Sequence, residues 1–400
     1  MLCIIQFIVH FLGNEMSEYV MTSEYVSPGH PDKIADQISD TVLDTYVAKD
    51  PHAKVACETM VKGNTVYVCG EISSSIPLQQ QELEKSIRQT IIDIGYNHER
   101  LGFDGNTCNI HFDISEQSRE IHAGVEKGGD AIGAGDQGIM FGFATRETPT
   151  NMPPAIYLSK QLIDIAYATV HQNENEILRP DMKSQVTLRY EDGKVRNIDT
   201  IVLSCCHSEE YTVKNIREYV FEDILPIVQQ QLPDEIQSWF TDTTRYLINP
   251  AGAWHQGGPK SDCGLTGRKI VIDQYGADCE IGGGAFSGKD STKVDKSAAY
   301  MARHIALATL KDHPDVEKVK VQLAYAIGEE YPVSCRIFNP DTKKEFALGR
   351  FSIQDLTPHG IQERLGLQYP IYLQTAKHGH FGNKSYTENG VRYYAWEEVS

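Results

Sequence analysis

The stretch KVACETMVKGNTVYVCGEIS, residues 54–73, decides the fold. Its two β-rich runs flank Lys62-Gly63-Asn64, and so short a glycine-containing connection is typical of a β-hairpin. A helical pattern precedes the hairpin over Lys33–Val47, with apolar residues four apart, and a polar helix is predicted after it over Gln79–Ile94. The stretch therefore predicts a hairpin enclosed in the sequence by two helices.

This order of helix, strand, strand and helix recurs twice further along the chain. The strand pairs begin near residues 54, 185 and 318, about 130 residues apart. Hairpins imply antiparallel or mixed sheets. We therefore predict an α+β protein of three similar subdomains in a pseudo-threefold arrangement, with helices on one face of each sheet; a chance recurrence is the alternative. The later copies are predicted at 155–171, 184–190, 197–205 and 213–230, and at 295–310, 318–327, 333–338 and 353–365.

The copies divide the chain into an N-terminal subdomain, 17–120, a central subdomain, 131–249, and a C-terminal subdomain, 250–390. Residues 1–16 precede them. Their apolar run has no basic flank and is too short to span a bilayer. Because Met16 opens a sensible beginning, 1–16 is predicted to be a dispensable extension, with a targeting segment as the alternative.

Composition narrows the class of partner. The formal net charge of −18 argues against nucleic acid and against anionic membranes, both of which favour a basic surface. It leaves a small anion such as ATP open, because a local lysine cluster can bind phosphates. The nine cysteines include no CxxC pair, which favours neither a disulfide framework nor a zinc site. A reducing, cytoplasmic compartment is expected.

A glycine-bearing loop precedes each copy, and we expect the three loops, 27–33, 133–138 and 282–290, to converge on one pocket. The third, GGGAFSGKD, resembles the start of a Walker A loop. We reject that assignment because Asp290 stands where a hydroxyl is needed, and because the predicted strand KIVID, 269–273, ends well before the loop. The glycine N–H groups and two lysines four apart on one face, Lys289 and Lys293, still predict a polyphosphate site. An ordinary solvated helix start is the alternative.

The first loop offers a metal ligand. Asp32 is either a cap of the following helix or, beside His30 and Lys33, a ligand of Mg²⁺. Asp36, Asp40 and Asp44 repeat every fourth residue of that helix and are predicted to form a solvated face. Cations and carboxylates alternate over separate loops, which fits a metal–polyphosphate site. The cations are Lys33, Arg268, Lys269, Lys289 and Lys293, and the carboxylates are Glu24, Asp32, Glu58, Asp136, Asp262 and Asp295.

Several segments together resemble S-adenosylmethionine synthase (methionine adenosyltransferase). They are TSEYVSPGHPDKIADQISD (22–40), GAGDQG (133–138), INPAG (248–252), DCGLTGRK (262–269) and GGGAFSGKDSTKVDKSAAY (282–300), and the similarity continues past HGHFGN (378–383). The resemblance implies three similar α+β subdomains and a homodimer, often a dimer of dimers or homotetramer, with active sites at the subunit interface. It implies attack of the methionine sulfur on C5′ of ATP, release of triphosphate and its cleavage to pyrophosphate and phosphate. Two Mg²⁺ and one K⁺ per site are expected.

The resemblance also implies site residues. Catalytic roles fall to His30, Lys289, Arg268 and Asp136. ATP would be bound by His30, Asp192, Gly193, Lys194, Ala253, Trp254, Asp262, Arg268, Lys269, Ala285 and Lys289. Methionine would be bound by Glu71, Gln117, Asp262 and Lys293. Mg²⁺ would be held by Asp32, Glu24 and Asp295, and K⁺ by Glu58.

Two segments depart from the family pattern. QSREI, Gln117–Ile121, stands where Gln-Ser-Pro-Asp-Ile is usual, and Ala253-Trp254 where Arg-Phe is common. Trp254 can still stack on adenine. These departures bear on loop gating, nucleotide affinity and substrate preference. Two other functions stay open: a non-catalytic homologue of the same fold, and a different ATP-dependent ligase or kinase.

Overall fold

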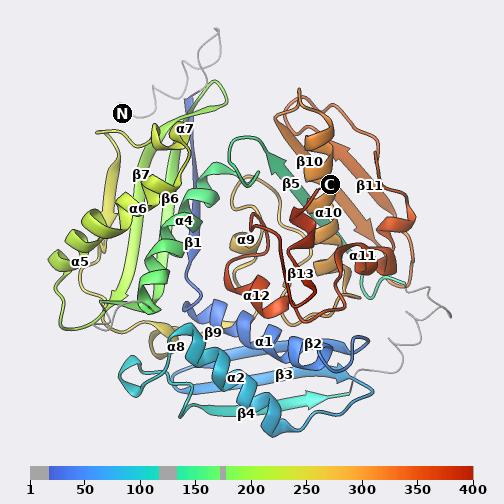
Figure 1. The fold of residues 1–400 in the computed structure, drawn as a ribbon, viewed down its shortest axis with the longest axis horizontal. Coiled ribbons are helices and arrows are strands. Elements are labelled where there is room, and N and C mark those ends of the chain that lie inside the picture. Colours follow the sequence, from blue (N-terminus) through green and yellow to red (C-terminus); the bar gives the residue numbers. More distant parts are fainter. Residues whose placement is uncertain (1–17, 117–132, 172–176, 400) are drawn as a thin grey trace, which may run out of the picture.

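The computed structural model describes residues 18–116, 133–171 and 177–399. The extension 1–16, Gln117 and the QSREI segment lie outside these residues. Figure 1 shows three units of helices and strands placed around a central region that contains α9 (Ile270–Asp273) and α12 (Tyr372–Lys377). The α+β class and the three-domain architecture are therefore confirmed.

The N-terminal unit has a four-stranded sheet in the order β4-β3-β2-β9. The hairpin of β2 and β3 is antiparallel, as predicted, and β4 is added parallel to β3. The elements are α1 (Pro31–Val47), β2 (Lys54–Lys62), β3 (Thr65–Ser73), α2 (Gln80–Ile94), η3 (Glu99–Leu101), β4 (Asn109–Ser115) and β9 (Gly264–Leu265).

The central unit has a sheet in the order β1-β6-β7-β8, in which β6 and β7 form a long antiparallel hairpin. The predicted helix 213–230 is divided by a π-helical turn, η5, into two α-helices. The elements are β1 (Glu18–Val26), α4 (Pro154–Ala168), η4 (Thr169–His171), β6 (Leu178–Glu191), β7 (Lys194–His207), α5 (Val213–Tyr219), η5 (Val220–Ile224), α6 (Leu225–Gln231), α7 (Asp234–Gln237) and β8 (Arg245–Ile248).

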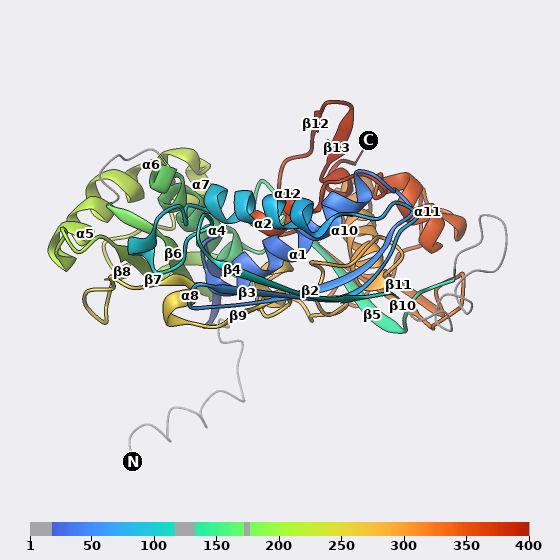
Figure 2. The same cartoon turned by 90° about the horizontal axis from the view of Figure 1, so that it is seen from below.

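The C-terminal unit has a three-stranded antiparallel sheet in the order β11-β10-β5, packed against α10. A small hairpin of β12 and β13 projects from the helical side (Figure 2). The elements are β5 (Gly138–Thr145), α10 (Val294–Asp312), β10 (Lys318–Tyr325), β11 (Ser334–Phe338), η6 (Gln354–Leu356), α11 (Pro358–Leu365), β12 (Tyr386–Glu388), β13 (Val391–Tyr393) and η7 (Ala395–Glu397). The short helix α8 (Gly258–Ser261) instead lies beside the N-terminal unit and contacts β2 (Figure 1).

The three units exchange strands in a cycle. β1, from the start of the chain, pairs with β6 of the central sheet. β5, from the central part of the sequence, pairs with β10 of the C-terminal sheet, and β9, from the C-terminal part, pairs with β2 of the N-terminal sheet. Each sheet thus contains a strand from another sequence segment, which ties the units together.

Helices cover one face of the sheets, as predicted, while the strands gather on the opposite side of the molecule (Figure 2). In β2, for example, alternate residues are buried beneath the helices, and the intervening ones lie on the other face. Strands of all three sheets carry exposed apolar side chains, namely Val20, Tyr67, Ile139 and Leu265.

Two expectations from the sequence are wrong. KIVID is not a strand, because residues 270–273 form α9 and the Asp273 N–H donates to the Lys269 carbonyl oxygen at 2.9 Å. This helical turn lets Asp273 accept a hydrogen bond from Lys33 at 2.7 Å. The predicted solvated acidic face of α1 is in fact inward-facing: Asp36 and Asp40 are fully buried.

The carboxylates of α1 accept backbone N–H groups from the C-terminal part of the chain. Asp32 accepts from Leu265 at 3.0 Å, Asp36 from Gly267 at 2.8 Å and Asp40 from Gly288 at 2.8 Å. One helical turn further on, Asp44 accepts from Tyr372 at 3.0 Å and from Leu373 at 2.8 Å. The four-residue spacing therefore fixes successive loops along one face of α1.

We predict that Asp40→Ala destabilises the protein by about 3–5 kcal/mol, because it leaves the Gly288 N–H without its acceptor and the fully buried Lys296 ammonium without its carboxylate, which lies 3.5 Å away. Urea unfolding measures the loss. Asp93→Ala, an exposed position on α2, is the control and should change stability by less than about 0.5 kcal/mol. Equal effects of the two substitutions would contradict a role for the buried carboxylates in holding the fold.

Candidate active site

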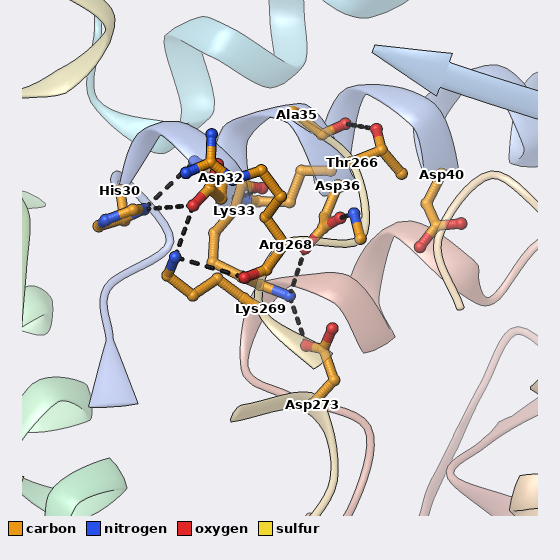
Figure 3. A network of polar contacts seen from close by, with 12 residues as sticks. His30, Asp32, Lys33, Ala35, Asp36, Asp40, Thr266, Arg268, Lys269 and Asp273 are labelled. Atoms are coloured by element: carbon orange, nitrogen blue, oxygen red, sulfur yellow. Dashed lines mark hydrogen bonds and ion pairs between the residues drawn. The ribbon is translucent and has the colours of Figure 1, made fainter. Parts of the chain in front are cut away.

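The first loop and α1 bring together His30, Asp32, Arg268 and Lys269 (Figure 3). His30 is the N-cap of α1, and its Nδ1 accepts the Asp32 N–H at 3.2 Å. Asp32 therefore does not cap the helix. Its carboxylate lies 2.5 Å from Lys269 Nζ and 3.7 Å from Arg268 Nε. One buried carboxylate thus faces two cations at the start of the helix.

The electrostatics of this cluster keep His30 neutral. Burial lowers the pKa of His30 to about 3, and the positive charges of Lys269 and Lys183 act in the same direction. Since Nδ1 accepts a hydrogen bond, the ring proton resides on Nε2. Burial alone would raise the pKa of Asp32, but the hydrogen bonds from Lys269 and Leu265 hold it below its ordinary value. The site therefore combines a neutral N–H donor with an ionised carboxylate.

Lys33 has a different role from the one expected. Its ammonium is almost completely buried and lies 3.1 Å from Asp36 and 2.7 Å from Asp273. Burial opposes the charge of Lys33, but the two carboxylates outweigh it and raise the pKa of the amine. Lys33 therefore fixes α9 against α1, and its ammonium group already has two carboxylate partners inside the fold (Figure 3).

The third loop packs against β2, through hydrogen bonds to the strand. The Cys57 N–H donates to the Gly288 carbonyl oxygen at 2.9 Å, and a Cβ at residue 288 would lie 1.8 Å from the Cys57 oxygen. Gly288, at φ +77°, is required for this approach. Asp290 accepts the Val55 N–H at 2.8 Å and pairs with Lys293 at 2.5 Å, so the residue that departs from the Walker pattern holds the loop to the sheet.

The two lysines of this loop point to different partners. Lys289 Nζ lies 2.5 Å from Asp295, the acidic residue in the first turn of α10, whereas Lys293 is the N-cap residue of that helix and contacts Asp290. The four-residue spacing had suggested that Lys289 and Lys293 lie on one helix face, but both residues precede α10 and contact different carboxylates. Burial raises the pKa of Asp295, an effect that its hydrogen bond from Lys289 offsets in part.

A cavity of about 410 Å³ lies beside Lys289, on the open face of the N-terminal sheet. Its lining includes Glu58, Glu71, Ala285 and Lys289, all of them predicted site residues. Ala56 is the register partner of Glu71 on one side and of Lys289 on the other. The cavity therefore has one cationic edge and an acidic wall, which suits a zwitterionic amino acid.

Three further predicted carboxylates do not line this cavity. Asp136 is exposed, and its negative charge contributes to the raised pKa of Asp295, so the two acids are near enough for their charges to interact. Asp262 is exposed next to α8, and its charge likewise contributes to the raised pKa of Asp181. Glu24 is an exposed residue of β1 opposite Gln185.

The turn Asp192-Gly193-Lys194 is not brought to the cluster. It closes the β6–β7 hairpin at the end where β6 meets the first residues of β1, since Glu18 pairs with Glu191. At the other end of the same strand pair, Val26 pairs with Lys183, close to His30. Eight residues of strand separate Lys183 from Glu191, or roughly 26 Å.

Asp181 and Lys183 were missed by the sequence analysis, although they form an Asp-x-Lys triplet like that of residues 192–194. Asp181 accepts the Gly258 N–H at 2.7 Å. Burial raises its pKa to about 7, while the Gly258 N–H and the charge of Lys183 lower it. The triplet at 181–183 thus joins the loop after Trp254 to the cluster around His30.

Trp254 belongs to the same region, because its segment is bonded to the end of β7. The Trp254 carbonyl accepts the His207 N–H at 2.9 Å, and the indole N–H donates to the Gln256 carbonyl at 2.9 Å. Ala253 is exposed beside it. Both residues therefore lie a few positions before Gly258, whose N–H is bonded to Asp181.

Within residues 18–116, 133–171 and 177–399, no three side chains of His, Cys, Asp or Glu gather as a metal-binding group. No helix in these ranges is both long and apolar enough to cross a bilayer. Isolated carboxylates beside lysines are what the described part of the site offers.

Comparison with known proteins agrees with this arrangement. Residues 18–119 match the N-terminal domain of S-adenosylmethionine synthetase, residues 131–254 its central domain and residues 256–397 its C-terminal domain. The chain belongs to the S-adenosylmethionine synthetase family. It is 42% identical to the S-adenosylmethionine synthase of Zymomonas mobilis over 398 residues, which cover 96% of this chain and 97% of that protein.

Within this family assignment, we predict that Lys183→Ala weakens the binding of a non-hydrolysable ATP analogue by at least about tenfold, because a cation next to His30 is lost. Lys194→Ala removes the same charge at the far end of β6 and should change the affinity by less than about twofold. Isothermal titration calorimetry measures both. A larger loss with Lys194→Ala than with Lys183→Ala would restore the hairpin turn as the nucleotide contact.

Proposed function

We propose that this protein makes S-adenosylmethionine from ATP and L-methionine, by attack of the methionine sulfur on C5′ of ATP. Triphosphate leaves and is cleaved to pyrophosphate and phosphate before release. The observation that carries the proposal is the juxtaposition of Lys289 with an acidic cavity, in a family whose relative is named for this product.

The chemistry needs no general base, because a thioether has no proton to lose. Catalysis then consists of aligning sulfur with C5′ and of stabilising the negative charge of the departing triphosphate. The neutral His30 can donate its Nε2–H to an oxygen of the leaving group. Arg268, Lys269 and Lys289 supply positive charge, and we assign Asp136 to orienting the substrates.

The donor set fits Mg²⁺, a hard cation that binds through one or two carboxylates together with substrate phosphates. Asp32 and Asp295 would hold the two Mg²⁺, with Glu24 near the first, and Glu58 would hold K⁺. When bound, these cations would neutralise phosphate charge. In the protein alone, the ammonium groups of Lys269 and Lys289 lie against Asp32 and Asp295, respectively.

The substrate contacts divide between the two sides of the cavity. Glu71, Asp262 and Lys293 are proposed to bind methionine, with Gln117, outside the described residues, as a fourth contact. Ala253, Trp254, Asp262 and Ala285 are proposed to line the ATP site with His30 and the phosphate-binding cations. We add Lys183 to the residues proposed to bind ATP, because it lies beside His30. It replaces Asp192, Gly193 and Lys194 in that role.

We further propose that the enzyme is a homodimer, or a homotetramer built from such dimers, with the active site at the subunit interface. The exposed apolar side chains on the open sheet faces support this, since that side also carries the cavity. A cytoplasmic location is proposed as well. It is supported by the eight cysteines of the described part of the chain, all of which are free thiols.

Product analysis tests the activity. Purified protein incubated with ATP, methionine, Mg²⁺ and K⁺ should yield S-adenosylmethionine, pyrophosphate and phosphate in equal amounts. Formation of ADP or AMP instead would identify a kinase or ligase. The absence of any product, with ATP still bound, would identify a non-catalytic homologue.

Lys289→Ala should lower kcat by about 100-fold or more, because Lys289 stabilises charge that develops as triphosphate leaves. Folding should be unaffected, since the ammonium of Lys289 is partly exposed. Steady-state kinetics and circular dichroism measure both. Lys214→Ala, at an exposed position of α5, is the control for loss of one positive charge. An unchanged kcat in Lys289→Ala would refute the catalytic role of Lys289.

A further inference from the structure

His207, the last residue of β7, makes two hydrogen bonds to the backbone of Trp254. Its own N–H donates to the Trp254 carbonyl oxygen at 2.9 Å, and the Trp254 N–H donates to the imidazole Nε2 at 3.3 Å. His207 is fully buried. A side chain therefore supplies the acceptor that a neighbouring strand would otherwise provide, and it fixes the segment that carries the tryptophan.

These contacts are compatible with one protonation state. The imidazole Nδ1 lies 3.0 Å from the Ser208 carbonyl oxygen, which only accepts hydrogen bonds, so Nδ1 carries the proton. Nε2 accepts the Trp254 N–H and must present a lone pair. His207 is thus a neutral imidazole with a defined tautomer.

The surroundings favour this neutral form. The charged and titratable groups that act on the ring are His255 and Arg179. The two imidazole rings meet edge to face with centroids 4.5 Å apart, His255 Nδ1 lies 3.3 Å from the His207 carbonyl oxygen, and Arg179 donates to the His255 carbonyl oxygen. Burial lowers the pKa of His207, the Ser208 carbonyl opposes this, and the charges of His255 and Arg179 lower it further.

We propose that His207 is a positioning residue for the nucleotide: its neutral Nε2 holds the Trp254 backbone so that the indole face is placed for adenine. The inference rests on the proposed function, in which Trp254 stacks on that base. Protonation of His207 would set an N–H against the Trp254 N–H and remove the contact. ATP affinity should therefore be constant while His207 is neutral and should fall as pH drops through its lowered pKa, below the ordinary histidine value of about 6.5.

Two substitutions separate this role from simple burial. In His207→Gln the amide oxygen takes the place of Nε2 and can accept the Trp254 N–H. In His207→Asn the shorter amide lies near the position of Nδ1, and the Trp254 N–H loses its acceptor. We expect KM for ATP to rise about tenfold in His207→Asn and by less than about threefold in His207→Gln, with KM for methionine unchanged in both.

The affinity for an ATP analogue and the pH dependence of KM for ATP are two measurements that a merely structural role of His207 would leave unchanged. A non-hydrolysable ATP analogue should quench Trp254 fluorescence, identified by its loss in Trp254→Phe, and His207→Asn should need about tenfold more analogue. As the pH is lowered from 7.5 to well below 6.5, the KM for ATP of the wild type should rise relative to that of His207→Gln. Comparing the two proteins at each pH cancels the titration of ATP itself. His359→Gln, at a partly exposed histidine of α11, is the control and should follow the wild type at every pH.

Equal ATP affinities of His207→Asn and His207→Gln would overturn the proposal, and so would an equal rise in KM for methionine. If His207→Asn does not fold, the comparison of the wild type with His207→Gln over pH tests the proposal by itself. Identical pH profiles of KM for ATP would then overturn the proposal. A wild-type protein that binds no ATP analogue would refute the proposed function itself, which is a different result.

Discussion

The hydrogen bonds between the carboxylates of α1 and the backbone N–H groups of distant loops are the interaction on which the rest of the structure depends. Asp32, Asp36 and Asp40 are spaced one helical turn apart, and each accepts an N–H from the segment 265–288. The two loops that carry Arg268, Lys269 and Lys289 are thereby held against the same helix that begins at His30. Because buried carboxylates must be paired, lysine ammonium groups are buried next to them and form ion pairs with them.

This arrangement links folding to the site chemistry. The strand exchange through β9 places the loop 264–269 beside α1, and the packing of Gly288 on Cys57 places Lys289 at the edge of β2. The cations near the site are already opposite carboxylates, so in the proposed function a polyphosphate with its metal ions would exchange one set of charge pairs for another. The charged side chains of the described site are thus held in place by the fold before any ligand is bound.

The sequence predicted what local signals determine. The hairpins 54–73 and 184–205 and the helices α1, α2 and α10 were found because their apolar periodicity and turn residues lie within one element. The cyclic exchange of β1, β5 and β9 was not found, since each pairs with a strand more than a hundred residues away. The acidic repeat of α1 was assigned to solvent because charged periodicity alone does not show that backbone donors cover it.

The candidate site, like the fold, was predicted from the sequence only in part. His30, Asp32, Arg268 and Lys269 were identified from loop motifs and do come together. Asp192 and Lys194 were assigned to the nucleotide through the family resemblance, whereas Asp181 and Lys183, which have the same spacing, were not identified. Strand pairing decided otherwise, because Lys183 lies opposite Val26 and hence near His30. His207 carried no motif at all, and only its two contacts with Trp254 distinguish it.

The α1 cluster is assembled before substrate binds, with His30 held neutral and protonated on Nε2. Nitrogen-15 NMR of the histidine rings, with His30 assigned by its loss in His30→Gln, tests this directly. We expect a neutral Nε2–H ring that does not titrate between pH 8 and about 4.5, because burial and the nearby lysines lower the pKa of His30 to about 3. A His30 that titrates near 6.5, or that carries its proton on Nδ1, would contradict it.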